Sequence, residues 1–214
     1  MPTITAFKYS PDKGVGLARD MRIRWALEEA GQPYDVRLVT FEEMKQPAHL
    51  ALQPFGQIPT YEDGDLALFE SGAIVFHIAE RHTGLLPEDE ADRAKAISWM
   101  FAALNTIEPP IVERDHVKYF EADKCWQAER FDMVDERIRL RLDQLATAFR
   151  GSKWLAGSFS AADILMVHAI RRLEGSDILE DYQIFMDYIA SAADRPAYKR
   201  AFEAQYEVFQ NASS

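Results

Sequence analysis

The sequence predicts a protein of two parts, an α/β domain followed by an all-α helical bundle. Short strand-like and helix-like patterns alternate over residues 1–83, whereas long helical patterns dominate from residue 88 onward. The 214 residues are 48% hydrophobic and 28% charged, which is typical of a globular protein. We therefore expect a first domain at residues 1–83, a linker at residues 84–87 and a second domain at residues 88–214.

The first part of the α/β domain contains the patterns of a strand, a helix and a second strand. Residues 3–9 alternate polar and apolar side chains, as a half-buried strand does. Apolar residues recur at helical spacing over residues 21–30, and Gly31 and Pro33 follow where helices commonly end. Residues 34–40 carry the second strand pattern.

A hairpin and a further helix are expected in the rest of this domain. Residues 57–61 and 66–69 predict a third and a fourth strand. The Asp63-Gly64 pair between them suits a tight turn that needs a positive φ, so the two strands are expected to be antiparallel neighbours. From Ser71 onward, apolar residues recur at helical spacing.

The second domain shows three main helical segments. The first contains Trp99 and Ile107, and we expect Pro109-Pro110 to break it. The third begins at Ser160. The second segment carries a clean stripe at helical spacing, made by Phe131, Val134, Ile138, Leu142 and Leu145.

Charge and composition exclude several classes of partner. Acidic residues outnumber basic residues 35 to 24, and the net charge of −11 repels nucleic acids and anionic membrane surfaces. The single cysteine, Cys125, excludes an internal disulfide framework and fits a reducing compartment. We find no signal peptide or membrane-spanning run and expect a cytoplasmic protein. The histidines show no zinc-like pairing, so no metal is expected.

The most informative pattern is the pentad FGQIP at residues 55–59. A proline at the start of a strand cannot donate to the hydrogen-bond ladder and must lie at an edge or a bend. Pro59 has two readings: it ends a loop, or it forms a cis bond that leaves the backbone of Ile58 free to pair with a peptide-like ligand.

The pair Glu70-Ser71 at a predicted helix start is a second informative pattern. The Ser71 hydroxyl, the free N–H groups and the positive end of the helix dipole suit a carboxylate, and Glu70 suits an ammonium group. Together they fit the end group of an α-amino acid. Taken alone, Ser71 is an ordinary helix cap.

These features together resemble the cytosolic glutathione transferases of bacterial type, and the transferase class is left unassigned. The resemblance rests on QPFGQIP at residues 53–59, on Glu70-Ser71 and on the helix text at residues 22–31. It continues with the capping box at residues 160–164 and with Arg-Pro-Ala-Tyr at residues 195–198. The matching stretches follow the family's order along most of the chain.

The resemblance implies a thioredoxin-like domain that binds glutathione, a helical domain that supplies the electrophile pocket, and a homodimer. In this family pattern, the backbone of Ile58 pairs with the cysteinyl residue of glutathione, and Pro59 is cis. Glu70 and Ser71 hold the γ-glutamyl end. Lys45 matches a position that meets the glycyl carboxylate, although it also suits a solvated lysine on a mobile segment.

The residue that activates the thiol is the main departure from the family. A transferase must stabilise the glutathione thiolate near neutral pH. The family's serine position falls near Leu17 and its cysteine position near Arg19, neither of which has the usual hydroxyl or thiol. The candidates are Arg19, Ser10 and Tyr9, with backbone N–H groups as a fourth possibility. A structural interpretation of two of these residues is equally open. In it, Tyr9 packs in the domain interface, and Arg19 pairs with Asp20 or another acidic residue.

We interpret the chain as a glutathione transferase that conjugates the glutathione thiolate to hydrophobic electrophiles, a detoxification reaction. The alternatives are a glutathione-dependent isomerase, dehalogenase or peroxidase, or a non-catalytic glutathione-binding module. The side chains that could line the electrophile pocket lie on the first helices of the second domain: Trp99, Phe101, Ile107, His116, Tyr119 and Phe120.

The Ser160-to-Asp163 pattern predicts a structural feature of the second domain. The Ser160 hydroxyl can accept the N–H of Asp163, while the Asp163 carboxylate accepts the N–H of Ser160. We expect this capping box to affect stability and not turnover.

Overall fold

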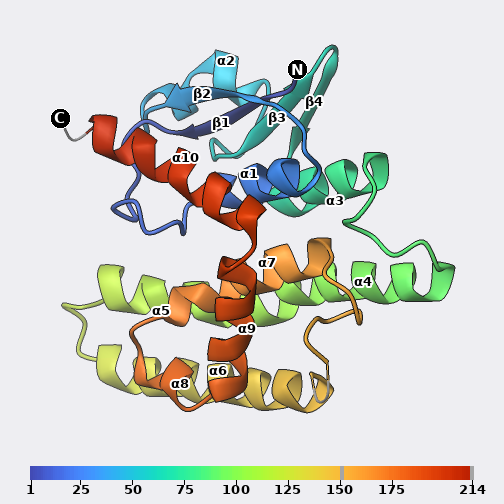
Figure 1. The fold of residues 1–214 in the computed structure, drawn as a ribbon. Coiled ribbons are helices and arrows are strands. Elements are labelled where there is room, and N and C mark those ends of the chain that lie inside the picture. Colours follow the sequence, from blue (N-terminus) through green and yellow to red (C-terminus); the bar gives the residue numbers. More distant parts are fainter. Residues whose placement is uncertain (150–151, 213–214) are drawn as a thin grey trace. The chain divides into compact units, whose positions relative to one another are not determined.

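The computed structural model describes residues 1–149 and 152–212, and the chain forms two compact units (Figure 1). The first unit consists of Met1–Leu86 and of the C-terminal segment that begins at Ala193. The second unit is Pro87–Ala192.

The first unit contains a four-stranded mixed sheet with the strand order β2-β1-β3-β4. The strands β1 and β2 are parallel, and β3 is antiparallel to both of its neighbours. The predicted hairpin is confirmed, because Asp63 of β3 pairs with Leu66 of β4. The strands are β1 (Thr3–Phe7), β2 (Asp35–Val39), β3 (Thr60–Asp63) and β4 (Leu66–Phe69).

The third strand begins three residues later than expected, at Thr60 and not at Gln57. Pro59 has no N–H group to donate to the ladder, so regular pairing starts only after it. The Thr60 N–H donates instead to the Thr5 hydroxyl at 2.7 Å, and both threonines are fully buried. This bond anchors the chain directly after the proline.

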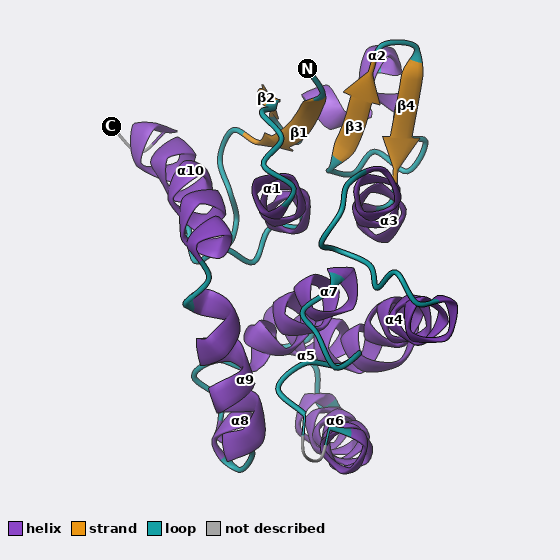
Figure 2. Ribbon diagram, turned by 45° about the vertical axis from the view of Figure 1, so that its right-hand side comes forward, coloured by secondary structure: helices purple, strands orange, loops and turns teal. Residues whose placement is uncertain are grey.

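Helices cover both faces of this sheet. Figure 2 shows α1 and α3 side by side on one face and α2 on the other. Ile4, Trp25 and Ile74 form part of the core and are almost completely buried. The helices of the unit are α1 (Asp20–Glu29), the 3₁₀ turn η1 (Glu43–Lys45), α2 (Pro47–Leu50), α3 (Ser71–Arg81) and α10 (Pro196–Ala212).

The C-terminal helix α10 packs along α1, and for this reason it belongs to the first unit. The rings of Trp25 and Tyr198 meet edge to face with centroids 4.9 Å apart. Arg195 pairs with Glu29, with the Arg195 Nε 2.6 Å from the carboxylate. The division by contacts thus differs from the division expected from the sequence, which assigns this segment to the second domain.

The second unit is helical. Its central helix, α7, has all 10 residues buried, which explains why its sequence is apolar on every side. The elements are α4 (Glu90–Ala102), the π-helical turn η2 (Ala103–Ile107), α5 (Glu108–Phe120), α6 (Gln127–Ala148), α7 (Ala161–Ile170), the 3₁₀ turn η3 (Arg171–Leu173), α8 (Asp177–Glu180) and α9 (Gln183–Ala193).

The expected break at Pro109-Pro110 is wrong. The prolines lie in the first turn of α5, where a missing N–H group costs no bond within that helix. The five π-helical residues of η2 connect α4 to α5 without an intervening loop. The chain therefore changes from α-helical to π-helical hydrogen bonding before the prolines, and the helix is not interrupted there.

Two further expectations for the second unit are confirmed, the first of them in part. The α6 stripe is buried at Val134, Ile138, Leu142 and Leu145, whereas Phe131 is partly buried. The capping box at the start of α7 is formed, and the Ser160 N–H donates to Asp163 at 2.8 Å.

None of the helices in the described part of the chain combines the length and the apolar character that crossing a bilayer requires.

Candidate functional site

The Ile58–Pro59 peptide bond is cis, as the sequence resemblance predicts. The Ile58 side chain is buried and packs with Val39 and Met44. Among the described residues, neither the N–H nor the C=O of Ile58 has a hydrogen-bond partner. The side chain is thus fixed while the backbone can pair with an extended ligand.

The loop before this bond is held by its own side chains. The His49 Nε2 lies 2.7 Å from the Gln57 carbonyl oxygen and donates to it. The buried Gln53 side chain accepts the N–H of Phe55 at 2.6 Å. At Gly56 the loop comes close to η1, since an added Cβ would lie 3.2 Å from the Met44 carbonyl oxygen.

Glu70 and Ser71 lie at the same end of the hairpin as Pro59. Thr60 pairs with Phe69 at the open end of the hairpin. Pro59 precedes Thr60 and Glu70 follows Phe69, so both lie at that end. Glu70 is exposed and has a φ of 68°, a conformation that is uncommon for a residue with a side chain. Backbone strain of this kind is concentrated at functional sites.

The Ser71 hydroxyl is oriented by an arginine that the sequence reasoning missed. Ser71 is buried at the first residue of α3, and its Oγ accepts a hydrogen bond from Arg22 Nη1 at 3.0 Å. The Ser71 hydrogen can therefore be donated to a ligand that lies at the positive end of α3. The Arg22 side chain is 1% exposed in a helix whose residues 20–27 are all buried, and the local sequence pattern gave no signal of its contact with Ser71.

Lys45 is exposed and ends η1, directly after Met44. Because the Met44 carbonyl borders Gly56, the structure brings Lys45 to the side of the same loop.

The candidates for thiol activation follow β1. Tyr9 is 56% exposed, and the Lys8 Nζ lies 5.7 Å from the centre of its ring. The Ser10 hydroxyl donates its hydrogen to the Asp12 carboxylate at 2.5 Å. In this arrangement Ser10 has no hydrogen left to give to a thiolate.

Asp12 organises the loop and was missed by the sequence reasoning. One carboxylate oxygen accepts the N–H of Gly14 at 3.0 Å, and the other accepts those of Leu17 at 2.6 Å and Ala18 at 3.0 Å. The N–H groups that precede α1 are therefore engaged by this carboxylate. The signal in the sequence was the placement of an aspartate just before a glycine-rich turn.

Arg19 is the helix cap residue of α1 and is partly buried. It lies three residues before Arg22, on the same side of the helix start. The adjacent Asp20 is fully buried and pairs with Arg24, whose Nε lies 2.8 Å from the carboxylate. Burial raises the pKa of Asp20, and the charge of Arg24 opposes that rise.

The six side chains expected to line an electrophile pocket have different surroundings. Ile107 is buried in the core of the second unit. Phe101, Tyr119 and Phe120 are largely exposed, and the rings of His116 and Phe120 meet at a tilt with centroids 5.1 Å apart. Trp99 is partly buried.

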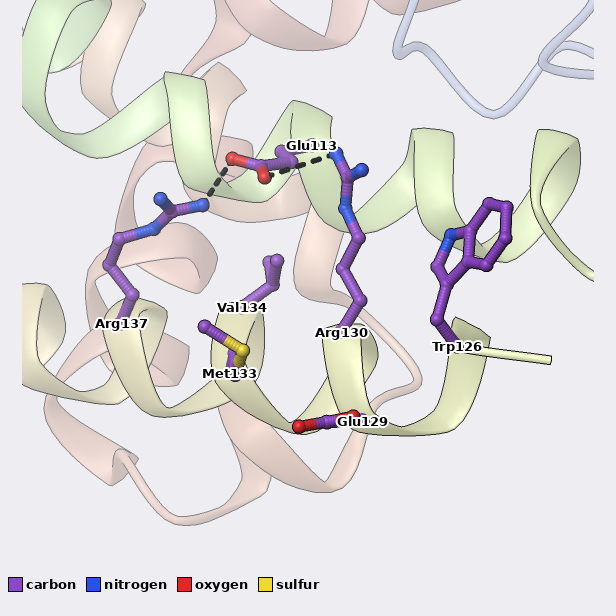
Figure 3. A pocket seen from close by; sticks show the side chains of 7 residues that line it. All are labelled: Glu113, Trp126, Glu129, Arg130, Met133, Val134 and Arg137. Atoms are coloured by element: carbon purple, nitrogen blue, oxygen red, sulfur yellow. Dashed lines mark hydrogen bonds and ion pairs between the residues drawn. The ribbon is translucent and has the colours of Figure 1, made fainter. Parts of the chain in front are cut away.

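A pocket of about 430 Å³ lies in the second unit on α5 and α6 (Figure 3). Figure 3 shows Glu113 bridging Arg130 and Arg137 along this pocket. None of the six expected electrophile residues lines it. The lining residues are Glu113, Trp126, Glu129, Arg130, Met133, Val134 and Arg137.

Within the described ranges, no group of three or more histidine, cysteine or acidic side chains is arranged to hold a metal ion.

Known proteins resemble this chain in sequence and in fold. A protein-family model described as the N-terminal domain of glutathione S-transferase matches residues 13–80. Glutathione S-transferase 4 of Zea mays is 36% identical over 186 residues, which cover 80% of this chain and 82% of that protein. Glutathione S-transferase F9 of Arabidopsis thaliana is 31% identical over 172 residues, which cover 73% and 78% of the two chains. The chain belongs to the glutathione S-transferase family.

The fold of this glutathione S-transferase agrees with solved structures of the family. A glutathione transferase from Pseudomonas putida, solved with one glutathione disulfide bound per subunit, has a TM-score of 0.83. That likeness covers 94% of this chain and 90% of the other, at 23% identity. The first unit is accordingly thioredoxin-like, and a helical region follows it, as the sequence predicts.

The family match also separates the two halves of the site. Residues 13–80 include the Ile58 edge, Glu70-Ser71, Lys45 and Arg19. Tyr9 and Ser10 precede the matched region. The residues expected to bind glutathione thus lie in the matched part of the chain, and two of the three candidates for thiol activation lie outside it.

Proposed function

We propose that this chain binds glutathione and conjugates its thiolate to hydrophobic electrophiles. The observation that carries the proposal is the unpaired backbone of Ile58 at the same edge as the start of α3. A tripeptide can add to that edge as a short strand while its α-amino-acid end reaches Ser71 and Glu70.

Each binding residue has a separate role in this proposal. The Ile58 N–H and C=O pair with the cysteinyl backbone, and the cis bond at Pro59 shapes the edge. Ser71 and the N–H groups of α3 hold the γ-glutamyl carboxylate, and Glu70 holds the ammonium group. Lys45 meets the glycyl carboxylate.

The chemical step is a nucleophilic substitution. The thiol loses its proton to solvent, the thiolate forms a C–S bond, and the leaving group departs with its electron pair. Of the three candidates, Arg19 is favoured, because its guanidinium is always charged and carries several donors. Ser10 already donates to Asp12, and Tyr9 is an exposed residue beyond the strand. The reaction is accelerated by formation of the thiolate and by holding it close to the electrophile, without a covalent enzyme intermediate.

A non-catalytic glutathione-binding module is the second candidate function. It is favoured by Asp12, which takes the Ser10 hydrogen and the N–H groups of Leu17 and Ala18. These groups are then not available to a thiolate, whereas the binding half of the site is unaffected.

The proposal includes a homodimer, a cytoplasmic location and no metal cofactor. A reducing compartment keeps glutathione in the thiol form that the reaction consumes.

The change Ser71→Ala tests the binding half. Because hydrogen bonds to charged groups contribute about 1.5–3 kcal/mol, we expect glutathione to bind at least about tenfold more weakly. Unfolding should be easier by about 1 kcal/mol, because Arg22 loses one acceptor. Titration calorimetry and chemical denaturation measure the two effects.

A matched control and an activity assay complete the experiment. Ser98→Ala removes an exposed serine hydroxyl from α4 and should leave glutathione affinity unchanged. Turnover of an aryl halide by the unmodified chain supports the transferase, and binding without turnover supports the module. If the unmodified chain does not bind glutathione, both functions are wrong.

A further inference from the structure

The C-terminal helix α10 packs directly on the loop that precedes α1, although about 190 residues separate them in the sequence. An added Cβ at Gly14 would lie 2.7 Å from Phe209 Cδ1 and 3.0 Å from Tyr206 Cδ2. Figure 1 shows α10 running past α1 and this loop. The loop therefore fits against the aromatic face of α10 only because residue 14 has no side chain.

The aromatic face is a continuous stack. Tyr198, Phe202, Tyr206 and Phe209 follow one another along α10, with neighbouring ring centroids 6.3, 6.1 and 6.3 Å apart. The first ring of the stack meets Trp25 of α1, and the last meets Gly14. The four rings thus form one aromatic face along α10.

Gly14 is also bonded to the residue that organises the loop. Its N–H donates to Asp12, the same carboxylate that accepts from Ser10, Leu17 and Ala18. Gly14 has a φ of 78°, which a residue with a side chain rarely adopts. Phe209 therefore packs against a residue that belongs to the Asp12 network.

Gln205 makes a second contact to the same segment. Its side chain is buried, and its Nε2 lies 3.5 Å from the Ala18 carbonyl oxygen. Both backbone polar groups of Ala18 are thus engaged by side chains, because its N–H donates to Asp12. The next residue along the chain is Arg19.

We propose that α10 positions the thiol-activating loop, with Phe209 and Gln205 acting through Gly14, Ala18 and the Asp12 carboxylate. The inference rests on the proposed function, because it assigns these two residues to the setting of the thiol pKa of bound glutathione. They are positioning residues. They do not belong to the edge that binds the tripeptide.

Phe209→Ala is the first test. Removing the ring releases Gly14, and we expect the pKa of the bound thiol to rise by about one unit, with a tenfold lower thiolate fraction at a pH below that pKa. At a pH below the thiol pKa, where the bound thiol is protonated in both proteins, the dissociation constant of glutathione should change less than twofold, because the Ile58 edge is untouched. The thiol pKa is read from the ultraviolet absorbance of the thiolate against pH, and the dissociation constant from calorimetry.

A glycine pair provides the matched control. Gly14→Ala places a methyl group against Phe209, whereas Gly31→Ala has a similar φ of 64° and nothing within 4 Å of the added carbon. Both variants carry the cost of a positive φ, and only Gly14→Ala adds the clash. We expect a raised thiol pKa in Gly14→Ala alone. The double variant Gly14→Ala/Phe209→Ala should recover part of the folding stability that Gly14→Ala loses, because it removes the clash.

The outcomes separate this inference from the proposed function. If the thiol pKa of glutathione is unshifted when bound to the unmodified chain, thiol activation itself is refuted. If that pKa is shifted in the unmodified chain and equally in Phe209→Ala, the role of α10 is refuted while the transferase proposal stands. Should Gly14→Ala fail to fold, Phe209→Ala and Gln205→Ala, read by the same thiol pKa, still decide the question.

Discussion

Asp12 in the first unit and Asp163 in the second each hold the chain at the start of a helix with one carboxylate, but they differ in burial. Asp163 is completely buried, whereas Asp12 is half-buried. Asp163 lies inside the helix that it caps, and Asp12 lies eight positions before α1 begins. An aspartate that accepts backbone N–H groups near a helix start thus occurs once in a core and once beside a candidate active site.

The partners of the two carboxylates show what each of them organises. Asp163 accepts from the N–H groups of Leu155 at 3.1 Å and Ser160 at 2.8 Å and from the Tyr188 hydroxyl at 2.7 Å. Ser160 and Tyr188 are buried in the second unit, and Leu155 is partly buried beside them. The groups bound by Asp12 come from its own loop. We conclude that Asp163 serves stability and that Asp12 serves the shape of the loop.

The largest expected effect is that of Asp163→Ala on folding. The change removes a helix cap and leaves buried donors without an acceptor, so the free energy of unfolding should fall by about 3 kcal/mol. Chemical denaturation measures it. Asp163→Asn should lose less, because its amide oxygen can still accept.

Glutathione binding checks that this effect is structural. Under conditions where Asp163→Ala is folded, its dissociation constant for glutathione should match that of the unmodified chain. A folded variant with weakened binding would contradict the division of roles between the two aspartates.

Asp12→Ala is expected to have a smaller effect on stability and a larger one on chemistry. Its hydrogen bonds are partly exposed, so the unfolding free energy should fall by about 1 kcal/mol. The loop before Arg19 loses its organiser, and the pKa of the bound thiol should rise by about one unit. Denaturation and thiolate absorbance against pH measure the two effects.

The opposite result for Asp12→Ala would favour the non-catalytic module. If the thiol pKa falls, the Asp12 charge opposes the thiolate in the unmodified chain, and removing it frees the N–H groups of Leu17 and Ala18. Ser10→Ala distinguishes the effect of the loop's hydrogen bonds on the thiol pKa from the effect of the Asp12 charge. It removes one hydrogen-bond donor to Asp12 and leaves the carboxylate in place.

The sequence predicted those parts of the fold that depend on neighbouring residues. The hairpin at Asp63-Gly64, the helix start at Ser71 and the capping box at Ser160 all follow from spacings of a few residues. The cis bond at Pro59 belongs to the same group, because Pro59 and Glu70 flank a single hairpin.

The parts that were not predicted depend on distant partners. Arg22 meets Ser71, and Gln205 meets Ala18, across separations that no local pattern encodes. The assignment of α10 to the first unit has the same cause. The predicted break at Pro109-Pro110 was wrong for another reason. A π-helical turn connects α4 to the helix that contains the two prolines, and the sequence alone does not indicate such a turn.

The smallest expected effect is the pH dependence that Asp163 contributes to stability. Burial raises the pKa of this carboxyl above its ordinary value of 3.8, and its hydrogen bonds from Tyr188, Leu155 and Ser160 oppose the rise. Since the folded-state pKa is the higher one, the stabilising contribution is complete below pH 3.8 and is lost as the pH rises through the folded-state pKa. Asp163→Asn cannot titrate, and Asp20 contributes equally to both proteins. The difference in unfolding free energy between the unmodified chain and Asp163→Asn should therefore fall with rising pH and then level off. A difference that grows with pH would show that the hydrogen bonds outweigh burial at this site.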